Sequence, residues 1–176
     1  GLVDADMQNA SSLWLREVEP DIPVHRFRTP DEILDEVPRL EHQMIVIDCP
    51  GGLKEATRAA LLVADLALIP CGPSILDVRA SDRGIQALDQ ARHIRKGLPR
   101  ALLIPNKLQR NYRLSKELLE ASKDLAVDVA PGLGLRQAFA RAPEEGNIVW
   151  KMGHSGEEAA REIRSLFQNL FSHEQV

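Results

Sequence analysis

Residues 43–52 read Gln-Met-Ile-Val-Ile-Asp-Cys-Pro-Gly-Gly, an apolar run that ends in an aspartate and a glycine turn. Two further runs have a similar form, residues 65–71 (DLALIPC) and residues 101–106 (ALLIPN). Strands of a parallel sheet are covered by helices on both faces, so they read as continuous apolar runs and not as an alternation of apolar and polar residues. The three runs therefore predict strands of a parallel sheet.

Amphipathic segments lie between these runs, with apolar residues three or four positions apart, which is the spacing of a helix with one buried face. They are residues 54–64, 77–96, 115–124, 135–142 and 157–171. In the last segment we expect one apolar stripe to dock on the sheet, made of Ala160, Ile163, Phe167, Leu170 and Phe171. Weaker strands are expected at residues 22–27 and 126–130. This alternation predicts a doubly wound α/β fold with a mostly parallel sheet and helices on both faces.

The composition is that of an ordinary globular protein. The chain has 176 residues, of which 44% are hydrophobic and 27% charged, and we expect it to form a single domain over residues 1–176. It has no apolar run of about 20 residues and no signal-peptide pattern. Two cysteines cannot form a disulfide scaffold. These features favour a cytoplasmic protein.

Polar residues follow three of the expected strands, at the edge where ligands bind in open α/β sheets. They are Asp4-Ala-Asp6 after Gly1-Leu2-Val3, which reads as the tail of a buried strand, Asp48 with Gly51 and Gly52 at the end of the run at residues 43–49, and Asn106-Lys107 at the end of the run at residues 101–106. An aspartate after an apolar strand, followed by glycines, is the pattern of a Walker B motif, whose carboxylate holds Mg²⁺ through water beside nucleotide phosphates. Taken alone, the same pattern also fits an aspartate that caps a strand before a turn.

Four blocks occur in an order that is far more specific. They are Asp4-x-Asp6-x-Gln8, Asp48-x-Pro50-x-Gly52, Pro70-x-x-Pro73-Ser74-x-x-Asp77 and Asn106-Lys107. Together they resemble the ParA/MinD family of deviant Walker A ATPases, in particular the ParA-type partition proteins, from Leu2 to about Leu170. The resemblance implies a P-loop NTPase fold that binds ATP and Mg²⁺.

The resemblance also implies a role for individual residues. Asp6 matches a catalytic aspartate that orients the attacking water or the water shell of the metal, and Asp48 matches the aspartate that holds Mg²⁺ through water. The implied nucleotide contacts are Gly51, Gly52, Asn106 and Pro131, with Asn106 at the adenine edge and Pro131 in the loop that closes over the base. Two alternatives stay open, because Asp4 also fits a strand cap and Pro131 also fits an ordinary loop residue. Gln109 stands where a guanine-reading motif needs an acid.

The phosphate loop of this family is missing from the sequence. No Gly-x-x-x-x-Gly-Lys-Ser/Thr motif occurs in the 176 residues, although this loop supplies the backbone amides and lysines that bind phosphate. We expect the first strand, the phosphate loop and the first helix to lie upstream of this chain, which is then N-terminally truncated and inactive alone. A homologue that has lost its loop is the alternative.

The net charge of −4 hides an uneven distribution. Residues 92–116 contain eight basic and no acidic side chains, while the other residues carry 14 basic against 26 acidic ones. Such a segment is typical of polyanion binding, although a solvated helix face with a loop gives the same pattern, and Lys107 fits the nucleotide site as well. The candidate DNA-binding residues are Arg92, Arg95, Lys96, Arg100, Arg110 and Arg113.

The resemblance implies an ATP-dependent homodimer that holds DNA non-specifically, hydrolyses ATP slowly and serves plasmid or chromosome partition. It further implies a nucleoid-associated location in the cytoplasm and stimulation by a ParB-like centromere-binding protein. Two alternatives remain, a MinD-like ATPase that cycles on a membrane and a non-catalytic pseudo-ATPase. Residues 157–171 disfavour the first, because their polar face mixes glutamates with arginines.

Overall fold

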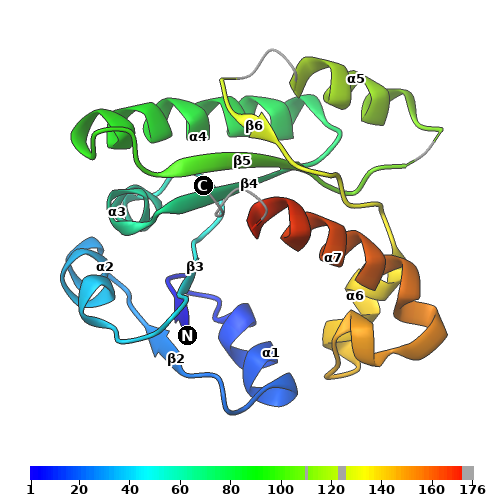
Figure 1. Cartoon of the computed structure of the whole chain (residues 1–176), viewed down its shortest axis with the longest axis horizontal. Coiled ribbons are helices and arrows are strands. Elements are labelled where there is room, and N and C mark those ends of the chain that lie inside the picture. The colour runs from blue at the N-terminus through cyan, green and yellow to red at the C-terminus, as the bar shows by residue number, and fades with distance from the viewer. Residues whose placement is uncertain (110, 123–125, 172–176) are drawn as a thin grey trace. The chain divides into compact units, whose positions relative to one another are not determined.

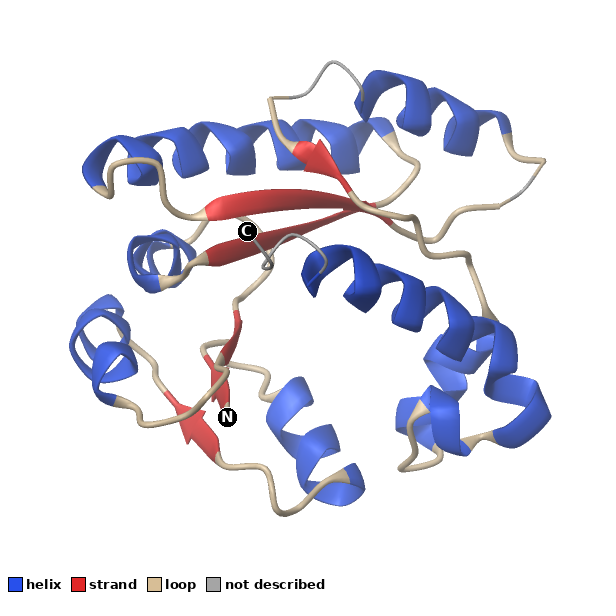
Figure 2. Cartoon of the chain, viewed as in Figure 1, coloured by secondary structure: helices blue, strands red, loops and turns tan. Residues whose placement is uncertain are grey.

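The computed structural model describes residues 1–109, 111–122 and 126–171, in which parallel strands alternate with helices (Figure 2). Short 3-10 turns follow α2 and precede α7. The strands and α-helices in chain order are β1 (Leu2–Asp4), α1 (Ala10–Val18), β2 (Val24–Arg26), α2 (Pro30–Glu36), β3 (Val46–Asp48), α3 (Glu55–Val63), β4 (Leu66–Cys71), α4 (Ile75–Ile94), β5 (Arg100–Pro105), α5 (Arg113–Ala121), β6 (Asp128–Val129), α6 (Gln137–Glu144) and α7 (Glu157–Phe171).

The chain forms two compact units. Unit 1 comprises Gly1–Ala67 and Gln86–Arg100, and unit 2 comprises Leu68–Ile85 and the described residues from Ala101 onward. The division passes through β4, α4 and β5, each of which contributes residues to both units. Each unit is described by its own sheet and core.

The sheet of unit 1 has the strand order β2-β1-β3 and is parallel throughout. In this register Asp4 at the end of β1 lies opposite Asp48 at the end of β3. Helix α1 lies on one side of the sheet, and α2 and α3 lie on the other (Figure 1). The core between the sheet, α2 and α3 is formed by Val3, Ala5, Ile33, Val37, Ala59 and Ala60. Burial of these apolar side chains is the main stabilising term of the unit.

The sheet of unit 2 has the strand order β4-β5-β6, and β5 pairs with β6 in parallel. Cys71 of β4, Leu103 of β5 and Leu118 of α5 form one core cluster. A second cluster packs α6 against α7 through Ala138, Ala142, Val149, Ala159 and Ala160. Figure 1 shows α5 and α7 on opposite sides of this sheet. The predicted α/β fold with parallel strands and helices on both faces is confirmed.

Two helices of unit 1 were not anticipated from the sequence. Helix α2 has a capping box, because the Glu32 amide donates to the Thr29 hydroxyl (3.2 Å) and the Thr29 amide donates to the Glu32 carboxylate (2.9 Å). The sequence Thr-Pro-Asp-Glu was the available signal for this helix. Helix α1 carries no such signal, since it begins after Asn9 in a left-handed conformation without a side-chain cap.

The apolar stripe expected on α7 is partly wrong. Its fully buried residues are Ala159, Ala160, Leu166 and Leu170, one set of helical neighbours. Phe167 and Phe171 are 46% and 37% exposed, and their rings stack on each other at a centroid distance of 5.9 Å.

Among the described residues, no helix has the length and hydropathy needed to cross a membrane.

Two neighbouring residues of α2 allow a test of the unit 1 core. Ile33 is completely buried, whereas Leu34 is 36% exposed. We expect Ile33→Ala to lower the free energy of unfolding by about 2–5 kcal/mol, because it leaves a cavity in the core, and Leu34→Ala by less than about 1 kcal/mol. Urea denaturation followed by circular dichroism measures both values. Equal losses in the two variants would contradict the packing described here.

Candidate functional site

Asp6 and Asp48 lie at the carboxyl ends of two adjacent parallel strands of unit 1, with Asp48 as the last residue of β3 and Asp6 two residues after the end of β1. The register places Asp4 opposite Asp48, and the Ala5 amide donates to the Asp48 carbonyl (2.9 Å). Asp6 follows two residues after Asp4, so β1 and β3 bring both carboxylates to one edge of the sheet. Both residues are half-buried. The structure therefore joins these two predicted site residues at the edge where ligands of such sheets bind.

Asp4 has a structural role at the same edge. It is fully buried, and its carboxylate accepts hydrogen bonds from the amides of Asp6 (3.1 Å) and Ser12 (3.1 Å) and from the Ser12 hydroxyl. Burial alone raises the pKa of Asp4, but the hydrogen bonds from Ser12 and Asp6 outweigh it and hold this pKa below the usual value. The geometry supports the capping alternative for Asp4.

Arg28 organises the turn that carries Asp6. Its guanidinium donates to the Asp6 carbonyl (3.2 Å) and to the Asn9 side-chain oxygen (2.6 Å). The Asp6 carboxylate accepts the Gln8 amide (3.1 Å), and Asn9 has a positive φ of 56°. No local pattern in the sequence points to Arg28, because 22 residues separate it from Asp6. The turn is thus held from β1, α1 and the segment after β2 together.

The half-buried Asp48 at the end of β3 is followed by a glycine turn with free space around its backbone. Gly52 has a φ of +79°, which favours glycine, and a Cβ at either Gly51 or Gly52 would meet no atom within 4 Å.

Burial and the neighbouring charge of Asp48 raise the pKa of Cys49 to about 11. Cys49 is therefore a protonated thiol at neutral pH and no nucleophile.

In unit 2 the structure brings the Asn106 and Pro131 segments side by side. The Asn106 amide donates to the Cys71 carbonyl (2.8 Å), and its side-chain oxygen accepts the Lys107 amide (2.8 Å). Leu108 forms a parallel bridge with Gly134. Asn106 and Pro131 are both half-buried. The two residues assigned to the base by resemblance thus belong to adjoining backbone segments.

The candidate DNA-binding residues are divided between the two units. Arg92, Arg95, Lys96 and Arg100 belong to unit 1, Arg113 belongs to unit 2, and Arg110 lies outside the described residues.

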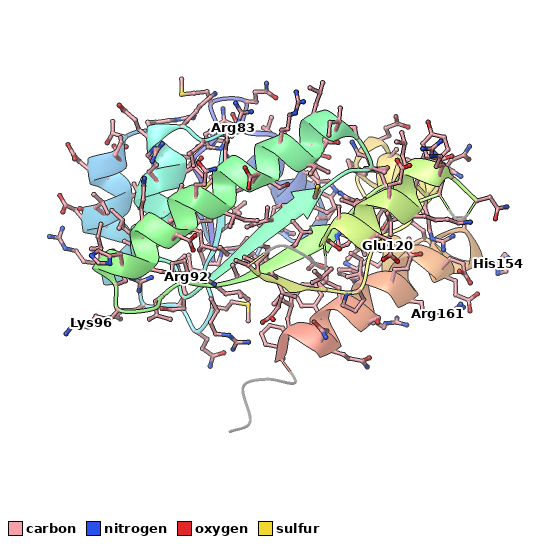
Figure 3. The ribbon with its side chains drawn as sticks, turned by 90° about the horizontal axis from the view of Figure 1, so that it is seen from above. Arg83, Arg92, Lys96, Glu120, His154 and Arg161 are labelled. Atoms are coloured by element: carbon pink, nitrogen blue, oxygen red, sulfur yellow. The ribbon has the colours of Figure 1, made fainter. Side chains whose placement is uncertain are left out.

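Three of these guanidinium groups are engaged within the chain. Arg92 donates to the Pro99 carbonyl (3.0 Å), Arg95 contacts the Ala64 carbonyl and Asp65, and Arg113 pairs with Glu117 (2.6 Å). Lys96 and Arg100 are exposed, and Figure 3 shows Lys96 pointing outward beyond the end of α4. The Arg113 side chain is also 89% exposed despite its pair with Glu117.

The chemistry of Asp6 and Asp48 is compatible with a Mg²⁺ ion that also binds substrate phosphates. Within the residues that the structure describes, no group of three or more His, Cys, Asp or Glu side chains is placed to hold a metal ion. Mg²⁺ commonly keeps several waters and takes only one or two carboxylates together with substrate phosphates. The pair Asp6 and Asp48 fits that requirement.

Comparison with known proteins identifies the class of protein. No family model matches the chain. It is 29% identical over 177 residues to the maintenance of carboxysome distribution protein A of Halothiobacillus neapolitanus, covering 97% of this chain and 82% of that protein. It is 32% identical over 128 residues to the septum site-determining protein MinD of Escherichia coli K12, covering 67% of this chain and 46% of MinD.

Solved structures agree on the fold. A plasmid partition protein from Borrelia burgdorferi B31 bound to AMPPNP aligns with a TM-score of 0.65, 16% identity and coverage of 96% of this chain and 85% of that one. Cyanthece apo McdA aligns with a TM-score of 0.66, 16% identity and coverage of 92% and 86%. The chain belongs to the ParA/MinD family of positioning ATPases.

The role of Asp4 can be tested through pH. Because its pKa is lower in the folded state than its ordinary value of 3.8, the ionised carboxylate stabilises the fold above that pH, and the stabilisation is lost as the pH falls through the folded pKa. We expect Asp4→Asn to cost about 1–3 kcal/mol at pH 7. The difference from the wild type should shrink below about pH 3.8.

Denaturation at a series of pH values measures this difference. Asp35→Asn on the exposed side of α2 is the matched control, with an expected change within about 0.5 kcal/mol. A loss for Asp4→Asn that stays constant down to pH 2 would contradict the assignment.

Proposed function

We propose that the protein is an ATP-dependent positioning ATPase that binds Mg-ATP, dimerises, holds DNA non-specifically and releases it after slow hydrolysis. The observation that carries the proposal is the pair Asp6 and Asp48 at the carboxyl ends of two adjacent parallel strands, while the Asp4 carboxylate is hydrogen-bonded within the turn after β1. Family membership supports the same activity. The nucleotide bound by a similar partition protein, AMPPNP, supports ATP as the ligand.

The residues divide the work by their chemistry. Asp48 holds Mg²⁺ through water, and Mg²⁺ neutralises phosphate charge when it is bound. Asp6 orients the attacking water with its carboxylate, on a turn that Arg28 holds. The backbone of Gly51 and Gly52 contacts the phosphates. The open space around these two glycines leaves room for that contact. Asn106 and Pro131 contact the adenine.

DNA binding is assigned to Lys96 and Arg100. Both are exposed, whereas Arg92 and Arg95 are engaged in holding the loops around Pro99 and Ala64. A nucleoid-associated location in the cytoplasm follows from this binding. A homodimer and a partner protein that stimulates hydrolysis complete the proposal, and the names of the similar proteins, which concern carboxysome distribution, septum placement and plasmid partition, support a cycle that positions a cargo.

DNA is favoured over a membrane as the surface on which the protein cycles. Binding of a helix to anionic lipid needs free basic residues on its polar face. On α7, Arg161 pairs with Glu158 (2.6 Å) and Glu157 (3.4 Å), and Glu162 adds a further acidic group. Arg164 is a second exposed arginine of α7, so the polar face of this helix mixes two arginines with three glutamates and is not the predominantly basic face that binds anionic lipid. Co-sedimentation with vesicles containing anionic lipid, run beside DNA binding, separates the two cases.

Substitution of the two carboxylates tests the ATPase. In the full-length protein we expect Asp6→Asn to lower kcat about 100-fold and to change the Kd for ATP by less than about threefold, because the residue acts on the water and not on the bound nucleotide. Asp48→Asn should weaken Mg²⁺-dependent ATP binding as well. Phosphate release and calorimetric titration measure the two effects, with Asp35→Asn as the control. Undiminished turnover in both variants would refute the assignment.

Charge reversal tests the DNA surface. We expect Lys96→Glu combined with Arg100→Glu to weaken DNA retention and to reduce the slope of log K against log salt concentration by roughly 2, one for each lost phosphate contact. Arg39→Glu is the matched control, since Arg39 is a highly exposed arginine of the same unit that pairs only with Glu36 in the contacts described. Equal DNA binding by the wild type and the double variant would exclude this surface.

A further inference from the structure

The segment that the proposed function assigns to the base is hydrogen-bonded to the chain at and after the end of β5. We call residues 131–135 the base loop. Its backbone runs beside residues 105–108, with hydrogen bonds from Leu133 to the Pro105 carbonyl (2.8 Å), from Leu108 to the Leu133 carbonyl (3.0 Å) and from Leu135 to the Leu108 carbonyl (2.8 Å). Asn106 lies inside the partner segment. Any shift of the base loop is therefore transmitted to the backbone on both sides of Asn106.

The contact between the two segments is close as well as hydrogen-bonded. A Cβ at Gly132 would stand 2.5 Å from the Leu108 side chain and 3.2 Å from the Pro105 carbonyl oxygen. A side chain at this position would have to move the end of the Leu108 side chain and would press on the Pro105 carbonyl oxygen. The base loop and residues 105–108 are therefore closely packed as well as hydrogen-bonded.

Glu162 of α7 contacts the base loop from outside the sheet. One oxygen of its carboxylate accepts the Gly134 amide (3.0 Å). The other accepts two hydrogen bonds from the guanidinium of Arg136, at 2.9 Å from Nε and 2.6 Å from Nη2. A single side chain therefore binds the backbone of the loop and the first residue after it.

The Arg136 pair is stronger than an ordinary surface ion pair. The Glu162 side chain is only 22% exposed and that of Arg136 34%, so water screens the pair less than it screens exposed charges. Arg136 also occupies the N-cap position of α6 without a side-chain capping hydrogen bond, at the helix end where the dipole disfavours a positive charge. The carboxylate of Glu162 offsets that penalty. Glu158 adds a weaker contact to Arg136 at 3.3 Å.

We propose that Glu162 is a positioning residue for the base loop, through which α7 sets the affinity of the protein for the purine base of its nucleotide. The inference rests on the proposed function, since it concerns the site to which ATP is assigned. Glu162 itself touches no nucleotide in this proposal. It acts through the Gly134 amide and Arg136, and the loop carries the effect to Pro131 and Asn106.

The first test needs no nucleotide. Amide hydrogen exchange of the full-length protein reports on the base loop directly, and we expect Glu162→Ala to speed exchange at Gly134 roughly tenfold or more. Glu162→Gln keeps an acceptor for this amide, so its exchange rate should lie between those of the wild type and Glu162→Ala. Glu157→Gln on the same helix is the control, because Glu157 pairs with Arg161 and His154 and not with the loop. Unchanged exchange at Gly134 in Glu162→Ala would overturn the proposal.

The second test separates the base from the phosphates. Calorimetric titrations of the full-length protein with ATP and with inorganic tripolyphosphate, which has no base, give two values of Kd. We expect Glu162→Ala to weaken ATP binding roughly five- to tenfold and to leave tripolyphosphate binding unchanged, with partial recovery in Glu162→Gln. General destabilisation would weaken both probes equally, which would overturn the proposal.

A failure of the proposed ATPase function gives a different pattern of Kd values from a failure of the role of Glu162. If the wild-type protein binds neither ATP nor tripolyphosphate, the ATPase assignment is wrong, and the positioning role falls with it. If the wild type prefers ATP and Glu162→Ala keeps the same ratio of the two Kd values, the ATPase assignment stands and only the role of Glu162 is overturned.

Discussion

The buried carboxylate of Asp4 accepts hydrogen bonds from the backbone that follows β1, and the edge of the unit 1 sheet depends on this contact. A buried carboxylate is tolerated only when its charge is compensated by donors, and here the amides of Asp6 and Ser12 and the Ser12 hydroxyl supply them. The same bonds set the path of the chain from β1 into α1. Asp6 is consequently presented beyond the strand, opposite the end of β3, where Asp48 stands.

Three aspartates therefore meet at one edge with different tasks. The Asp4 carboxylate is buried and hydrogen-bonded to the backbone, so it stabilises the fold. Asp6 and Asp48 are half-buried and lie where a ligand approaches such a sheet. The division follows from environment and not from residue type, since the three carboxylates are chemically the same. In unit 2 the comparable device is Glu162, whose two oxygens serve the Gly134 amide and Arg136. In both places a carboxylate orders the backbone next to a residue assigned to the nucleotide.

Much of the fold could be predicted from local patterns. The runs ending at Cys49, Cys71 and Asn106 correspond to β3, β4 and β5, and the amphipathic segments correspond to α3 to α6 with shifted ends and to α7 with the expected ends. These elements are long or strongly periodic, so their sequences carry the information. The short helices α1 and α2 were not predicted, although residues Thr29 to Glu32 have the sequence pattern of a capping box. The stripe on α7 was misassigned at Phe167 and Phe171, because 3.6-residue periodicity leaves the edge of a stripe undefined.

The sequence by itself determined the class of fold, the family, and the order of Asp6, Asp48, Asn106 and Pro131 along the chain, because strand periodicity and short motifs are local properties. Only the tertiary structure decided that Asp4 is buried, that Arg28 and Glu162 hold the segments around the candidate site, and that Arg92 and Arg95 are engaged while Lys96 and Arg100 are exposed. Glu162 stands 28 residues from Gly134, and Arg28 stands 22 from Asp6. Contacts at such separations follow from the packing of whole helices and strands, and no short stretch of sequence encodes them.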